Sequence, residues 1–169
     1  MSRRSTLWLI TAFLLLHNVE EAVAFHRYLP QIVERLSRWG PGIIHISYSQ
    51  MLFALTLATL IPLALVAWAV RRPDQAAVLW FVLLVQVVML LNVFSHLAAA
   101  LFVMRGYSPG LLTAVLINLP FSLYLLRRAV SEQWLSRRAL WLTLPAAILV
   151  HGPLLLGLIR LSGELVGSH

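Results

Sequence analysis

The sequence contains no cysteine and no lysine, and only six of its 169 residues are acidic. The missing cysteine excludes disulfides, thiolate nucleophiles, cysteine-based zinc sites and thiol redox chemistry. Charged residues make up 11% of the chain, whereas soluble domains carry about 25%. Hydrophobic residues reach 60% and the mean hydropathy is +0.86. This composition indicates an integral membrane protein that forms a single domain over residues 1–169.

Because lysine is absent, all thirteen basic residues are arginines, and they give a net charge of +7. A nucleic-acid interface would place such residues along one solvated face with aromatic side chains between them. Here the arginines instead stand in short clusters between apolar runs, which is typical of a membrane-topology signal. We therefore expect membrane lipids as partners and no nucleic acid. The clusters are Arg3/Arg4, Arg71/Arg72, Arg127/Arg128 and Arg137/Arg138.

Five apolar runs are long enough to cross a hydrocarbon core of about 30 Å. Short polar stretches separate them, including the turn sequence at 105–110. We therefore expect an all-α fold, a polytopic membrane bundle of five transmembrane helices. The expected spans lie near 6–28, 48–70, 76–104, 109–128 and 139–160.

The segment between the first two spans has the pattern of an amphipathic helix. Ile32, Leu36 and Trp39 recur at helical spacing, with Glu34 and Arg35 on the other side. We expect a short interfacial helix near 30–39, ended by the glycines and proline that follow it. Such a helix serves either as a connector that shields the bundle or as a lid over a site.

The distribution of arginines predicts the orientation in the membrane. With the N-terminus inside, eight arginines fall on the inner side and five on the outer side. Basic residues are in excess on the inner side of membrane proteins. We therefore expect the N-terminus inside and the C-terminus outside.

Polar residues interrupt the first span within the stretch "LLLHNVEEAVAFH", at 14–26. His17, Glu20 and Glu21 are spaced i, i+3, i+4, so all three project from one side of a helix. A charge at the centre of a membrane helix costs about 2.5–3.5 kcal/mol, which makes intramembrane carboxylates candidates for function. Asn92 and His96 show the same i, i+4 spacing on the third span.

Further polar residues lie at a similar depth on the last two spans. The depth of a residue in the bilayer follows from a rise of about 1.5 Å per residue, counted from the helix end. By this count Asn118 and His151 lie in the outer half of the bilayer, as do the polar residues of the first and third spans. The simplest interpretation is a hydrogen-bond network that joins helices, and for Asn118 we favour it. For His17, Glu20, Glu21 and His96 this interpretation is weaker, because serine, threonine or asparagine join helices at lower cost.

Two kinds of chemistry suit these residues. Histidine nitrogens and carboxylate oxygens are ligands for zinc or iron, and a bound cation would offset the charge of two buried glutamates. The expected ligand set is His17, Glu20, Glu21, His96 and His151. Alternatively, glutamate and histidine exchange protons without a metal, either in acid–base catalysis or as the relay of a small transporter.

Three motifs occur in a fixed order along the chain: His17-x-x-Glu20-Glu21, Asn92-x-x-x-His96 and Tyr107-x-Pro109-Gly110. In this order the chain resembles the HXXEE-motif family of bacterial membrane proteins, whose function is unknown. The resemblance implies a bacterial cytoplasmic (inner) membrane location and a membrane enzyme. It singles out the named residues of the three motifs, but not Asn118 or His151.

Together these observations predict a membrane enzyme with a polar site in the outer half of the bilayer. We expect metal-assisted chemistry, with zinc or iron, on a lipid-like or membrane-dissolved hydrophobic substrate. The expected catalytic residues are His17, Glu20, Glu21 and His96, with Asn92, Tyr107 and Asn118 in supporting positions. The alternatives are a proton-coupled small transporter and a non-catalytic membrane helper protein whose buried glutamates and histidines act as a relay or join the helices.

Overall fold

The computed structural model describes residues 1–38, 46–154, 157 and 161. Within these residues the chain is all-helical and contains no strand, and five continuous helical bodies follow one another in the expected order. The bodies are α1 (Arg3–Ser37), α2 (Tyr48–Arg71), α3 (Ala76–Ala98) with the π-helical η1 (Ala99–Met104), then α4 (Leu111–Thr113) with η2 (Ala114–Asn118) and α5 (Leu119–Ser131), and finally α6 (Arg137–Leu149) with η3 (Val150–Leu154).

Four of these bodies are long and apolar enough to cross a membrane: Arg3–Ser37, Tyr48–Arg71, Ala76–Met104 and Leu111–Ser131. The fifth expected span corresponds to α6 and η3. Its last part, residues 155–156 and 158–160, lies outside the described residues.

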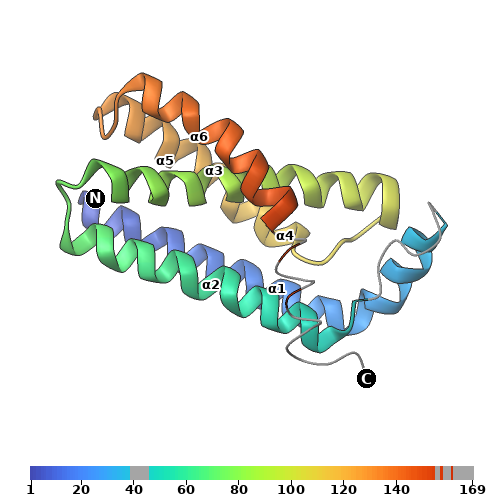
Figure 1. Cartoon of the computed structure of the whole chain (residues 1–169). Helices are drawn as coiled ribbons and strands as arrows, with labels where there is room; N and C mark the ends of the chain where they lie inside the picture. The colour runs from blue at the N-terminus through green and yellow to red at the C-terminus, as the bar shows by residue number, and fades with distance from the viewer. Residues whose placement is uncertain (39–45, 155–156, 158–160, 162–169) are drawn as a thin grey trace.

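The expected interfacial helix near 30–39 is not a separate element. Residues 30–37 instead continue α1, which includes Pro30 as an internal residue, and residue 39 lies outside the described part of the chain. Figure 1 shows that the last turns of α1, in the lighter blue, bend away from the axis of its first part, as a proline within a helix produces. The Arg35 guanidinium donates hydrogen bonds to the backbone carbonyls of Val103 and Met104, so the bent end is attached to the end of η1.

Local sequence signals explain where the helices begin. The Ser47 hydroxyl accepts a hydrogen bond from the Gln50 backbone, while the Gln50 side chain accepts one from the Ser47 backbone, which forms a capping box at the start of α2. Ser136 caps α6 by accepting from the Ala139 backbone N–H.

The helices pack as a bundle in which α1 and α2 run side by side and α6 crosses over α3 (Figure 1). The core lies mainly between α1, α3 and α5, where Ile10, Val82, Leu83 and Leu125 are fully buried. A polar contact joins α1 to α2, because the Asn18 amide donates to Thr59 Oγ1 at 2.7 Å.

The arginine clusters gather at one end of this bundle. The start of α1, the turn between α2 and α3, and the turn between α5 and α6 all lie at the left end of Figure 1. There the guanidinium groups of Arg3 and Arg128 lie 5.1 and 5.6 Å from the ring centre of Trp134. Arg128 also donates to Glu132 at 2.6 Å. The contact of Arg3 with Trp134 therefore joins α1 to the turn between α5 and α6, whereas the ion pair is local to the end of α5.

Candidate metal or acid–base site

Three ionisable side chains converge inside the bundle. His17 and Glu21 lie four residues apart on α1 and so share a face, and His96 meets them from α3. The Glu21 carboxylate oxygens lie 3.7 Å from His17 Nε2 and 3.5 Å from His96 Nε2. One potential ligand atom from each residue lies within 4.8 Å of the other two. All three residues are buried, with 1% exposure at His17, 9% at Glu21 and 7% at His96.

Asn92 holds the two imidazole rings in position. Its amide nitrogen lies 2.9 Å from His17 Nε2 and 3.0 Å from His96 Nε2. Since this nitrogen is only a donor, it gives one hydrogen to each ring, and both Nε2 atoms carry a lone pair. Asn92 therefore contacts both histidines, and the lone pairs that accept its hydrogens are those that a metal would use.

The other nitrogen of His17 is fixed by a second contact. His17 Nδ1 lies 2.8 Å from Thr113 Oγ1, and this hydroxyl donates to Glu20 Oε2 at 2.5 Å. Because the single hydroxyl hydrogen goes to Glu20, Thr113 must accept from the His17 Nδ1–H. Contacts on both sides of the ring therefore define the same tautomer, with the proton on Nδ1 and the Nε2 lone pair accepting from Asn92.

The two adjacent glutamates face different surroundings. Glu20 points to the N-terminal turn of the α4–α5 body, where it accepts hydrogen bonds from the backbone N–H groups of Leu112 and Thr113 at 3.2 and 2.7 Å. The Tyr107 hydroxyl also donates to Glu20, at 2.6 Å. Backbone N–H groups at a helix start have no partner within the helix, so Glu20 satisfies them and they stabilise its charge. Glu21 has no such donors among the described residues.

Burial of the phenol is the main cause that raises the pKa of Tyr107, and its hydrogen bond to Glu20 raises this pKa further. The Tyr107 hydroxyl therefore remains a proton donor. Tyr107 therefore contacts the site through Glu20.

The segment that carries Tyr107 turns back into the bundle. Figure 1 shows the chain, in yellow, leaving the far end of α3–η1 and returning toward the middle of the bundle, where α4 begins. Ser108, Pro109 and Gly110 are buried there. Gly110 has φ +80, and a Cβ atom on it would lie 2.8 Å from Glu21 Cγ, His17 Cε1 and His96 Cε1. Gly110 is thus packed directly against all three converging side chains.

Widened π-helical turns surround this site. η1 begins three residues after His96, η2 begins directly after Thr113, and η3 contains His151. Such turns are rare and frequently occur at functional sites, because the extra residue changes the direction of the side chains that follow.

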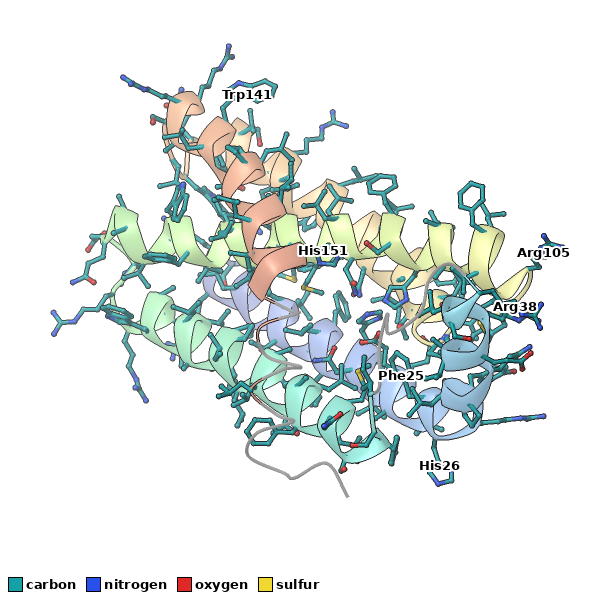
Figure 2. All side chains as sticks on the ribbon, turned by 45° about the vertical axis from the view of Figure 1, so that its right-hand side comes forward. Phe25, His26, Arg38, Arg105, Trp141 and His151 are labelled. Carbon is teal, nitrogen blue, oxygen red and sulfur yellow. The ribbon has the colours of Figure 1, made fainter. Side chains whose placement is uncertain are left out.

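The structure separates two of the five expected ligands from the other three. Glu20 is held by Tyr107 and by the start of the α4–α5 body. His151 Nε2 lies 2.8 Å from Ser95 Oγ, and Figure 2 shows His151 where the end of α6 crosses α3. The group of three within 4.8 Å comprises His17, Glu21 and His96. Asn118 is buried, and no hydrogen bond among the described residues joins it to this group.

Sequence reasoning missed Thr113, which contacts both His17 and Glu20. Its one signal is position: it follows Gly110 by three residues in the first turn of a helix, where a hydroxyl and free N–H groups occur together. Asn18, although inside the first motif, belongs to the contact between α1 and α2.

Comparisons with known proteins agree with the motifs. Residues 8–125 match the family model described as "Protein of unknown function with HXXEE motif". The chain is also 29% identical over 147 residues to the uncharacterized protein YrkK of Bacillus subtilis (strain 168), covering 86% of this chain and 85% of that relative. No solved structure matches the chain. With the motif at His17–Glu21 and a family match over most of its length, the chain belongs to the HXXEE-motif family.

Proposed function

We propose that His17, Glu21 and His96 hold one divalent first-row metal ion, with zinc the best fit. The observation that carries this proposal is the meeting of two Nε2 lone pairs and one carboxylate in a buried space. Zinc binds nitrogen and oxygen ligands at about 2.0–2.1 Å in tetrahedral geometry, which separates neighbouring ligand atoms by about 3.3 Å. The two separations between the Glu21 oxygens and the histidine nitrogens, 3.7 and 3.5 Å, are close to this value.

The charge at the site also supports a cation. Glu20 is compensated by hydrogen bonds from Tyr107 and from the start of the α4–α5 body, whereas Glu21 is buried beside two imidazole rings that offer lone pairs. A metal ion would neutralise Glu21 and use both lone pairs at once. It would replace the hydrogen bonds from Asn92, because each Nε2 has a single lone pair.

A set of two histidines and one glutamate leaves an open coordination position. Zinc sites of this composition activate a bound water, and iron sites of this composition bind oxygen or substrate at the open positions. We therefore propose a metal-assisted membrane enzyme whose substrate is lipid-like or dissolved in the membrane. Glu20, joined to His17 through Thr113 and to Tyr107, is the acid–base group of this proposal.

The membrane location rests on the four helices that are long and apolar enough to span a bilayer. The clustering of paired arginines at one end of the bundle supports an inner-membrane orientation with the N-terminus inside and the C-terminus outside.

One observation favours a second function, a proton relay. Hydrogen bonds connect Tyr107, Glu20, Thr113 and His17 in one continuous chain, and the Asn92 amide links the His17 ring to that of His96 without itself exchanging protons. In a metal-free protein such a chain suits a proton-coupled transporter. Proton flux into liposomes that is lost in Glu20→Gln, together with an absence of zinc binding, would select this alternative over the metal enzyme.

The Thr113 hydroxyl provides a direct test of the proposed site. Thr113→Val removes the acceptor that fixes the His17 Nδ1–H while conserving side-chain volume. We expect zinc affinity to fall by about 10–100-fold, the usual effect of losing a group that orients a metal ligand. The measurement is competition between the purified protein and a zinc-sensitive chelator.

Thr113→Ser retains the hydroxyl and serves as the matched control, so it should keep most of the affinity. If Thr113→Val binds zinc as well as the unaltered protein does, the contact between Thr113 and His17 has no part in metal binding.

A further inference from the structure

Two adjoining hollows lie on the bundle at the turn between α5 and α6, away from the histidine cluster. One has a volume of about 390 Å³ and includes the polar side chains of Gln133, Ser136 and Arg137. The other has a volume of about 500 Å³ and is almost wholly apolar. Val130, Arg137 and Leu140 line both, so the two hollows form one continuous surface with a polar end and an apolar end.

The apolar hollow is formed where three helices meet. Val87 and Leu90 come from α3, Leu126 from α5, and Trp141 and Leu144 from α6. Arg137 and Leu144 lie seven residues apart, which corresponds to about 10 Å along the helix. Figure 2 shows Trp141 on the outer side of α6, so this hollow lies on the side of the bundle that would face lipid.

The polar end carries uncompensated positive charge. The nearby Arg128 is paired with Glu132, but among the described residues no carboxylate forms an ion pair with Arg137. Arg137 is exposed and stands at the first turn of α6, where backbone N–H groups add partial positive charge. This is also the end of the bundle where the paired arginines gather (Figure 1).

We propose that these hollows bind one anionic phospholipid. Its phosphate group lies against Arg137 and the start of α6, and an acyl chain lies in the apolar hollow between α3, α5 and α6. The volumes lie within the range of about 300–1,000 Å³ that ligand sites occupy. The positive charge at one end of the site suits the phosphate group of such a lipid, and the apolar walls suit its acyl chain. Basic pockets between membrane helices bind anionic headgroups. The proposal is independent of a metal at the histidine cluster.

Native mass spectrometry of the purified full chain tests this proposal. The protein in detergent is offered phosphatidylglycerol, which is anionic, or phosphatidylcholine with the same acyl chains. We expect the unaltered protein to prefer phosphatidylglycerol and Arg137→Gln to lower that preference about fivefold. Arg138→Gln is the matched control, because it removes a neighbouring charge that lines neither hollow, and it should retain the preference. Leu144→Trp fills the apolar hollow and should reduce binding of both lipids.

Several results would overturn the proposal. They are equal binding of the two lipids by the unaltered protein, equal effects of Arg137→Gln and Arg138→Gln, and undiminished lipid binding by Leu144→Trp. Full competition by free glycerol phosphate would show a site for the headgroup alone. A dimer that Leu144→Trp dissociates would show that a second copy of the chain occupies the hollow.

Discussion

We expect Glu21→Gln to lower the zinc affinity of the purified protein by more than about 100-fold. Glu21 supplies the carboxylate that lies within 3.7 Å of His17 Nε2 and within 3.5 Å of His96 Nε2. The amide of glutamine has nearly the same shape, but it lacks the negative charge that binds a cation. Loss of groups that only orient a ligand costs about 10–100-fold, so loss of the ligand itself should cost more. Competition with a chromophoric chelator measures the affinity.

His96→Ala should have a similarly large effect, because it removes one of the two nitrogen ligands. His26→Ala is the control for loss of a histidine, since His26 is exposed, packs against Tyr48 and is not one of the three clustered residues (Figure 2). Equal zinc affinities for Glu21→Gln and the unaltered protein would show that Glu21 does not bind the metal.

Gly110→Ala should both destabilise the protein and abolish zinc binding. The residue has φ +80, where side chains other than glycine cost about 1–2 kcal/mol. The added methyl group would lie 2.8 Å from atoms of Glu21, His17 and His96, and overpacking of this kind costs about 1–3 kcal/mol more. The three side chains can relieve the contact only by moving apart. Thermal unfolding in detergent and zinc titration measure the two effects.

Gly106→Ala is the matched control four residues earlier. A Cβ atom at Gly106 would approach only the Met104 carbonyl oxygen, at 4.0 Å, so stability and zinc affinity should change little. If Gly110→Ala binds zinc normally, the close packing of this loop against the three side chains is not part of the site.

The sequence predicted the helices well because the length and polarity of the apolar runs determine them. The expected third span, 76–104, coincides with α3 and η1, and the second ends within one residue of α2. The amphipathic pattern of residues 30–39 suggested a separate helix, but residues 30–37 continue α1. The structure instead accommodates Pro30 within a bent α1, whose end is attached to η1 through Arg35.

Helical spacing placed His17, Glu20 and Glu21 on one face, and the depth count placed His96 at a similar level, but neither could separate Glu20 from Glu21. Successive residues on a helix differ by about 100°, so both glutamates fit one broad face. Their different roles depend on what lies opposite: α3 beside Glu21, and the start of the α4–α5 body beside Glu20.

The contacts of His151 and Thr113 depend on tertiary structure, which the spacing of residues along one helix does not predict. Depth counting placed His151 at a plausible height but said nothing of the rotation of α6 about its axis, which directs its ring to Ser95. Thr113 was missed because the fourth span was expected to begin at the membrane surface near residue 109. The chain instead turns back into the bundle before α4, which brings Thr113 to His17 (Figure 1).

The metal content of the unaltered protein tests the central claim most directly. The full chain would be purified without chelators and its metals determined by inductively coupled plasma mass spectrometry, with Glu21→Gln prepared in parallel. The proposed site predicts about one zinc or iron ion per chain in the unaltered protein and a nearly metal-free variant. A folded unaltered protein that contains no metal, and that binds none when zinc is added, would contradict the metal site.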